Sequence, residues 1–136
     1  MMNNKIYYLD SNICIFYMRG RNDKLINKVD SEMDFIKLPA IVQGELLTGA
    51  MKSITPDKEL EKVMTFCEPF EIVPFDKSMT KIYGRIRANL ERTGKRIGFD
   101  DLIIAATVYA RGGVLVTNNI SEFSRIDDLM LDDWTE

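Results

Sequence analysis

The chain has 136 residues, of which 46% are hydrophobic and 29% charged, the balance of an ordinary soluble globular protein with one core. It contains no histidine, which excludes a Ser-His or Cys-His nucleophile pair, a histidine general base and a histidine zinc site. The polar start and short apolar runs predict neither a secretory signal nor a membrane span, and the two cysteines lack metal-ligand spacing, so we expect a reduced, cytoplasmic protein.

Strands and helices are predicted to alternate along the whole chain. In chain order, the predicted elements are strand 6–9, helix 13–18, helix 24–31, strand 35–38, helix 40–53, helix 55–67, strand 70–74, helix 76–93, helix 101–110, strand 114–117, one helical turn within 118–125 and strand 130–131. This alternation predicts a parallel sheet with helices on both faces. Because no repeat or linker interrupts the pattern, we expect one α/β/α domain over residues 1–136.

Several element boundaries carry local signals. Pro39 is expected to stop the second strand, and Thr55 followed by Pro56 marks a helix start. Asp76 is expected to cap the long helix that Gly94 closes.

Asp10 directly follows the first predicted strand, so it lies at the carboxyl end of that strand. Ligands of open α/β sheets bind at this edge, which makes Asp10 the first candidate site residue. The alternative is that Asp10 or Ser11 only caps the next helix.

Glu45 and Asp101 are two further acids that have no basic residue three or four positions away. Glu45 could instead reach water from the edge of its apolar stripe. Asp101 could be a helix-start acid stabilised by the helix dipole, although Asp100 is expected to take the capping role.

The three acids taken together predict a cation site, which none of them predicts alone. Placed side by side, they would repel each other and raise each other's pKa unless a cation held them. Oxygen-only ligands favour magnesium or manganese over zinc, and without histidine the obvious nucleophile is an ion-activated water.

A polar segment after the fourth predicted strand offers supporting residues at the same edge of the sheet. Thr117, Asn118 and Asn119 could hold a ligand or a metal-bound water, or could simply form a polar turn. Glu122 could add a fourth carboxylate, or could form an ordinary surface pair with Arg125.

Positive charge gathers just before Asp101. Residues 81–96 contain six basic residues and one acid, a local charge of +5 in a chain whose net charge is -3. A basic face is predicted because Lys81, Arg85, Arg92 and Arg96 recur near helical spacing. Of these, Arg85, Arg92 and Arg96 are expected to bind a nucleic acid backbone. A solvated helix face is the alternative.

Five segments in the same order and spacing as in a known family carry a resemblance that runs nearly end to end. They are Tyr8-Leu9-Asp10-Ser11-Asn12, Glu45-Leu46-Leu47-x-Gly49, Tyr83-Gly84-Arg85-Ile86-Arg87-Ala88, Ile97-Gly98-x-x-Asp101-Leu102-Ile103-Ile104-Ala105-Ala106 and Val116-Thr117-Asn118-Asn119-x-x-Glu122-Phe123. Through these segments the chain resembles the PIN-domain ribonucleases, in particular the toxins of bacterial VapBC-type toxin–antitoxin modules.

The resemblance implies a PIN-like three-layer α/β/α sandwich with a mainly parallel five-stranded sheet. It implies that Asp10, Glu45 and Asp101 hold Mg²⁺ or Mn²⁺, which activates water for attack on an RNA phosphodiester, with structured RNA such as transfer RNA as the substrate. It also implies a homodimer and a cognate antitoxin that puts a basic side chain into the acid pocket. Many PIN domains carry an acid where this chain has Asn119, and Glu122 is the residue that can replace it.

Two other functions are consistent with parts of the pattern. A PIN-like module that binds RNA or protein without catalysis would keep the basic face and need no metal, and metal binding separates it from the nuclease. A phosphate-transfer domain fits less well. Asp10-Ser11-Asn12 lacks the second acid of the haloacid-dehalogenase type, and the segment after Val116 lacks the lysine of the response-receiver type.

Overall fold

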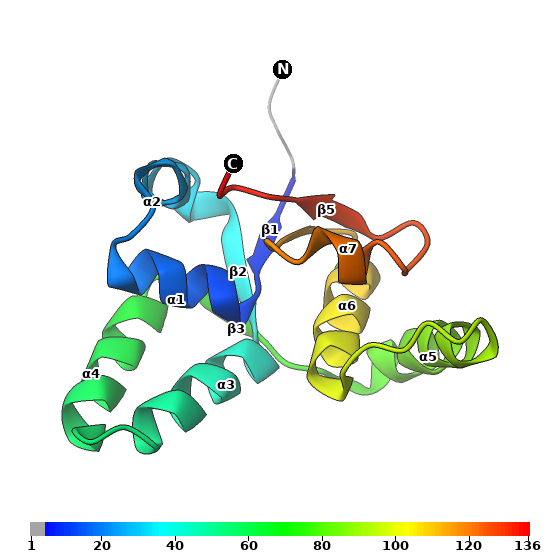
Figure 1. Ribbon diagram of the computed structural model, residues 1–136, viewed down its shortest axis with the longest axis horizontal. Helices are drawn as coiled ribbons and strands as arrows, with labels where there is room; N and C mark the ends of the chain where they lie inside the picture. The colour runs from blue at the N-terminus through cyan, green and yellow to red at the C-terminus, as the bar shows by residue number, and fades with distance from the viewer. Residues whose placement is uncertain (1–4) are drawn as a thin grey trace.

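The computed structural model describes residues 5–136 (Figure 1). Residues 1–4, which belong to the expected polar start and to the expected single domain, lie outside the described residues. The described chain forms five strands, β1 (Tyr7–Leu9), β2 (Ile36–Pro39), β3 (Glu71–Val73), β4 (Val114–Val116) and β5 (Met130–Asp132). Its α-helices are α1 (Ser11–Arg19), α2 (Asp23–Ser31), α3 (Ala40–Met51), α4 (Pro56–Cys67), α5 (Thr80–Arg92), α6 (Phe99–Arg111) and α7 (Ile120–Phe123). Two 3₁₀ turns, η1 (Met33–Phe35) and η2 (Lys77–Met79), precede β2 and α5.

The strands form one sheet in the order β3-β2-β1-β4-β5, with every neighbouring pair parallel. The expected five-stranded parallel sheet with helices is therefore confirmed. The chain builds β1, β2 and β3 outward in one direction and then returns to add β4 and β5 on the other side of β1. The strand order thus reverses between β1 and β4, which is where open α/β sheets place their ligand crevice.

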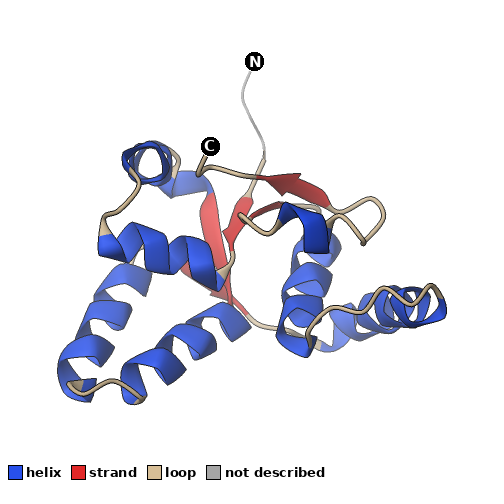
Figure 2. Cartoon of the chain, in the orientation of Figure 1, coloured by secondary structure: helices blue, strands red, loops and turns tan. Residues whose placement is uncertain are grey.

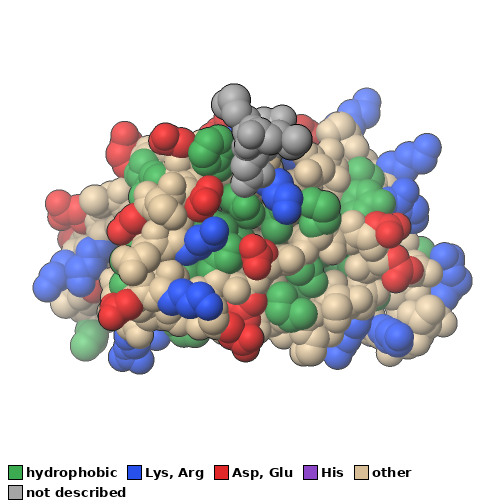
Figure 3. Space-filling model, turned by 90° about the horizontal axis from the view of Figure 1, so that it is seen from above, with side chains coloured by type: hydrophobic (Ala, Val, Ile, Leu, Met, Phe, Trp, Pro, Cys, Tyr) green, Lys and Arg blue, Asp and Glu red, His purple; other side chains and the backbone are tan. Residues whose placement is uncertain are grey.

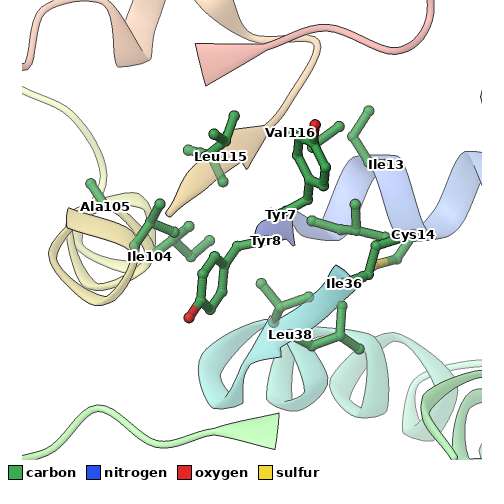
Figure 4. Packing of buried hydrophobic residues seen from close by; sticks show 14 of the residues in the cluster. Tyr7, Tyr8, Ile13, Cys14, Ile36, Leu38, Ile104, Ala105, Leu115 and Val116 are labelled. Carbon is green, nitrogen blue, oxygen red and sulfur yellow. The ribbon is translucent and has the colours of Figure 1, made fainter. Parts of the chain in front are cut away.

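Helices cover both faces of this sheet (Figure 1; Figure 2). In these views α1, α2 and α4 lie on one side of the strands, α5 and α6 lie on the other, and α3 and α4 form a helical hairpin. Since both faces are covered, a central strand must be apolar on both sides, and all three residues of β1 are buried. Figure 4 shows Tyr7 and Tyr8 pointing to opposite sides of β1, with Tyr8 directed toward Ile104 of α6.

Several predicted boundaries differ from the observed ones. Phe35 ends the η1 turn instead of starting β2, and Pro39 is the last residue of β2 because a strand end does not need its missing N–H. Asp76 caps the η2 turn through Ser78, and α5 begins only at Thr80.

The start of α6 is the difference that matters for function. The helix begins at Phe99 with Gly98 as its N-cap, so the expectation that Asp100 caps it is wrong. Gly98 has extended dihedral angles and its carbonyl accepts the first helical hydrogen bond, from the N–H of Leu102 at 3.0 Å. Asp100 and Asp101 therefore both lie in the first turn, and both side chains are available for other contacts.

Both cysteines, Cys14 and Cys67, are buried and free, as expected of reduced core thiols. Within residues 5–136, no helix combines the length and the apolar character that crossing a membrane requires. Figure 3 views the molecule from the end where the chain enters β1, and on this face acidic and basic side chains are interspersed. The candidate site lies at the other end of the strands.

Candidate active site

Asp10 and Thr117 meet at the point where the strand order reverses, because one follows β1 and the other follows β4. The backbone N–H of Asp10 donates to the carbonyl of Val116 at 3.1 Å, and the Thr117 hydroxyl hydrogen-bonds the Asp10 carboxylate. Asp10 is 5% exposed and Thr117 is fully buried. The capping interpretation of Asp10 is also correct, since its Oδ1 accepts from the N–H of Ile13 at 3.0 Å.

The burial of Asp10 decides its charge properties. Burial raises the pKa of Asp10, while the hydrogen bonds from Thr117 and the Ile13 N–H lower it. The charge of Asp133, which follows β5, raises it further. The α1 backbone fixes one carboxylate oxygen of Asp10, and burial is the largest influence on its pKa. Asp10 is therefore a positioned acid whose charge is screened by little solvent.

Glu45 projects from α3 toward the same edge of the sheet. The Ser11 hydroxyl donates to Glu45 Oε1 at 2.8 Å, which joins α3 to the start of α1. Burial is the main cause that raises the pKa of Glu45, and the charges of Asp100 and Asp10 add to it. Hydrogen bonding with Asp100 also raises the pKa of Glu45.

Asp101 forms a second carboxyl pair with Glu122. Burial is the largest cause that raises the pKa of Asp101 to about 6, followed by the charges of Glu122 and Glu45. Hydrogen bonding with Glu122 also raises the pKa of Asp101, and Asn119 Nδ2 donates to Glu122 Oε2 at 2.7 Å. Glu122 therefore belongs to the acid cluster, whereas Arg125, its alternative partner, donates to the carbonyl of Arg96 at 2.8 Å.

The structure thus brings together five carboxyl groups that come from three helices and one strand end, far apart in the sequence. This acid cluster consists of Asp10, Glu45, Asp100, Asp101 and Glu122. No ion pair to Lys or Arg reaches any of the five within residues 5–136. As the side chains stand in the described chain, no three acids converge closely enough to hold a metal ion directly.

The donor set nevertheless fits a hard divalent cation. The cluster offers only oxygen ligands, and Mg²⁺ binds through one or two carboxylates while it keeps several waters. The charges of neighbouring carboxylates raise the pKa values of Glu45 and Asp101, and a bound cation would relieve this repulsion.

Asp100 and Ser11 have roles in the acid cluster that the sequence did not reveal. Asp100 was not predicted as a site residue because it was expected to cap the helix. The feature that could have identified it is Gly98, which caps the helix without a side chain. Ser11 was considered only as a cap residue, although it orients Glu45. Asn118 is exposed, and Asn119 donates its backbone N–H to Thr117 Oγ1 at 2.9 Å.

The predicted basic face is only partly continuous. Arg85 lies over the ring of Tyr109 at 5.2 Å and Arg92 is exposed at the end of α5. Arg96 lies beyond the end of α5, so it is not on the helical face that its spacing suggested. Arg87, which shares this segment, is partly neutralised by Glu91, whose Oε2 accepts from Arg87 Nε at 3.0 Å.

The raised pKa values predict how pH changes the stability of the metal-free protein. The folded state holds the Asp101 proton up to about pH 6, whereas the unfolded chain releases it near the ordinary value of 3.8. Between these values the folded state binds more protons, so the free energy of unfolding falls as the pH rises through this window. Asp101→Asn removes this titration, and we expect it to stabilise the metal-free protein at neutral pH by about 1 kcal/mol, a figure reduced for partial solvent exposure.

Urea unfolding in chelator at about pH 5 and about pH 7.5 measures this effect. Wild-type protein should be more stable at the lower pH, and the difference should shrink in Asp101→Asn but not in the control Asp57→Asn, an exposed acid of α4. An equal pH dependence in wild type and Asp101→Asn would contradict the prediction.

Comparison with known proteins agrees with this geometry. The PIN domain family matches residues 7–129. Ribonuclease VapC2 of Rickettsia felis is 37% identical over 131 residues, which are 95% of this chain and 98% of that protein. The tRNA(fMet)-specific endonuclease VapC of Salmonella typhimurium is 34% identical over 128 residues, which are 94% of this chain and 97% of that protein.

Solved structures show the same fold. A crystal structure of DNA-bound VapBC from Salmonella typhimurium contains a chain that superimposes with a TM-score of 0.91 at 33% identity, covering 96% of this chain and 98% of that one. VapBC2 from Rickettsia felis, bound to a DNA fragment from its promoter, gives a TM-score of 0.89 at 37% identity, covering 95% and 98%. The chain therefore belongs to the PIN domain family and, within it, to the VapC ribonucleases.

Proposed function

We propose that the protein is a metal-dependent endoribonuclease, the toxin of a VapBC-type toxin–antitoxin pair, built as one PIN-like domain over residues 1–136. The observation that carries this proposal is the acid cluster at the reversal of strand order, where nearby carboxylates raise the pKa values of Glu45 and Asp101 and no basic side chain of the described chain pairs with the cluster. The full-length similarity to proteins named ribonuclease and tRNA-specific endonuclease supports RNA as the substrate, with structured RNA such as transfer RNA as the expected class.

Asp10, Glu45 and Asp101 are the residues that would hold Mg²⁺ or Mn²⁺. The chemistry that such a cation supplies is activation of a water nucleophile and neutralisation of charge on the phosphodiester. Asp10 is suited to this role because burial and the α1 backbone fix its carboxylate. Glu45 is oriented by Ser11, and Asp101 faces both Glu45 and Glu122.

Glu122 is the fourth catalytic carboxylate in this proposal. Glu122 lies close enough to Asp101 for its charge to raise the pKa of the Asp101 carboxyl. Asn119 holds the Glu122 carboxylate from the other side, so this neutral residue supports an acid without replacing it. Thr117 holds Asp10, and exposed Asn118 lies on the same segment within reach of a substrate.

Arg85, Arg92 and Arg96 are proposed to contact the RNA backbone. All three are exposed, and none forms an ion pair among the described residues. A phosphate can therefore bind them without first displacing a protein carboxylate.

We further propose a cognate antitoxin, a homodimer and action in the cytoplasm, where RNA is available. The two structural relatives described above are VapBC assemblies. A groove of about 1000 Å³ beside α1 and the α3–α4 hairpin is lined by apolar side chains such as Ile15, Met18 and Phe66, and Glu45 also lines it. A protein segment in this groove would reach the acid cluster.

RNA cleavage with and without divalent metal tests the nuclease. Purified, antitoxin-free protein is incubated with total RNA in Mg²⁺, in Mn²⁺ and in chelator. We expect discrete cuts that need the metal and that disappear in chelator. Folded protein that binds RNA but leaves it intact in both metals would support the non-catalytic binding module instead.

A further inference from the structure

A polar cavity borders the segments that carry Glu122 and Asp101, and it places two further cations, Lys95 and Arg125, beside Arg96 of the predicted basic face. The cavity has a volume of about 570 Å³ and opens to solvent between the α5–α6 loop and α7. Three of its six lining residues are cations, two are hydroxyl side chains, and none is an acid. The lining residues are Gly94, Lys95, Arg96, Ser121, Ser124 and Arg125.

The positive charge of this cavity is uncompensated. Arg125 donates from Nη1 to the carbonyl oxygen of Arg96 at 2.8 Å, which holds the guanidinium in place without neutralising it. Within residues 5–136, Lys95, Arg96 and Arg125 take part in no ion pair. A positioned guanidinium with free donors, next to two further cations and two hydroxyls, matches the way proteins bind phosphate.

The cavity and the acid cluster are built on the same two segments. Ser121 precedes Glu122 on α7, and Glu122 is near enough to Asp101 for its charge to raise the pKa of that carboxyl. Arg96 precedes Gly98, which caps the helix that carries Asp101. An RNA strand with one phosphodiester at the acids would therefore run along the segments that line the cavity.

The negative charge of the acid cluster also opposes the binding of RNA next to it. Its carboxyl groups repel a polyanion, and exposed charges act on each other within a Debye length of about 8 Å at physiological salt. Cations fixed on the adjoining segments oppose this repulsion where the substrate must bind.

We propose that the cavity between the α5–α6 loop and α7 binds one backbone phosphate of the RNA, beside the scissile one, and so sets which linkage reaches the acids. This inference rests on the proposed nuclease function and adds a substrate-positioning site with Lys95, Arg125, Ser121 and Ser124, beside Arg96. Arg125 is the main positioning residue because its guanidinium is already oriented.

RNA binding measured on the Asp10→Asn background, which suppresses cleavage, tests the proposal. Arg125→Gln and Lys95→Gln are compared with Arg111→Gln, which removes the same charge from an exposed residue at the other end of α6. We expect Arg125→Gln to weaken RNA binding about tenfold relative to that control. The slope of log K against log salt concentration should become less negative by about 0.7.

A substrate in which one linkage at a time is an uncharged methylphosphonate identifies the phosphate involved. One linkage near the cut should weaken binding to the Arg111→Gln protein when it is neutralised, yet have no effect on the Arg125→Gln protein. Equal losses at Arg125→Gln and Arg111→Gln, or no linkage with this coupling, would overturn the proposal. If Arg125→Gln unfolds, the same measurements are made on Lys95→Gln, which leaves the Arg125–Arg96 contact in place.

Other outcomes assign the cavity elsewhere. Inorganic phosphate that binds the cavity, combined with unchanged RNA affinity of the variants, would make it a free-anion site. Unchanged RNA affinity with weaker binding of the cognate antitoxin would make it a protein contact. Both overturn the proposal while wild-type cleavage persists, whereas failure of the nuclease function itself appears as wild-type protein that does not cut RNA in any metal.

Discussion

Asp10→Asn is expected to lower the rate of RNA cleavage by about 10³-fold or more without unfolding the protein. Asn keeps the size of the side chain and is itself a good helix cap, so the bond to the Ile13 N–H survives. The change removes only the charge that would hold the divalent cation. Asp101→Asn is expected to have the same effect on cleavage, since Asp101 lies in the same acid cluster.

Asp76→Asn is the matched control for this prediction. Asp76 also caps a turn by accepting from a backbone N–H, that of Ser78 at 3.0 Å, but it is exposed and not part of the acid cluster. Single-turnover cleavage in Mg²⁺ and urea unfolding should be measured on all three variants. If Asp10→Asn or Asp101→Asn cut at the rate of Asp76→Asn, the assignment of the catalytic acids would be wrong.

Gly113→Ala is expected to destabilise the protein by about 3 kcal/mol and lower its midpoint of thermal unfolding by about 10 °C. A Cβ at Gly113 would lie 2.7 Å from Cδ1 of Tyr8, closer still to Cε1 of the same ring, and 3.0 Å from the carbonyl oxygen of Ile6. Tyr8 is 1% exposed and stands on the central strand, so its ring has no free space into which it can move. The carbonyl of Ile6 is equally fixed, because it accepts the N–H of Val114 at 2.9 Å.

Gly84→Ala is the control for the same chemical change. Gly84 lies within α5, and a Cβ there meets no atom within 4 Å. Alanine is favoured over glycine inside a helix, so this variant should be more stable by about 0.5–1 kcal/mol. Thermal unfolding of both variants checks the prediction, and an unfolding midpoint for Gly113→Ala within a few degrees of wild type would contradict the packing argument.

The sequence alone predicted the fold class and four acids of the cluster, namely Asp10, Glu45, Asp101 and, as the fourth carboxylate, Glu122. Alternation of apolar strands and amphipathic helices predicts a parallel sheet because both patterns are local and periodic, and the observed order β3-β2-β1-β4-β5 agrees. Asp10, Glu45 and Asp101 could be selected because the lack of a base within one helical turn is also a local property. Their roles stay a prediction until the variants are measured.

The tertiary structure decided how the acids pair and where the positive charge lies. Gly98 caps α6, which leaves Asp100 close enough to Glu45, a residue 55 positions earlier in the chain, to raise the pKa of Glu45. Arg125 bonds the carbonyl of Arg96, 29 residues away, and so leaves Glu122 to the acid cluster. Hydrophobic periodicity specifies which face of an element is buried, but these contacts depend on how loops bring distant elements together, and that arrangement follows only from the packing of the whole sheet.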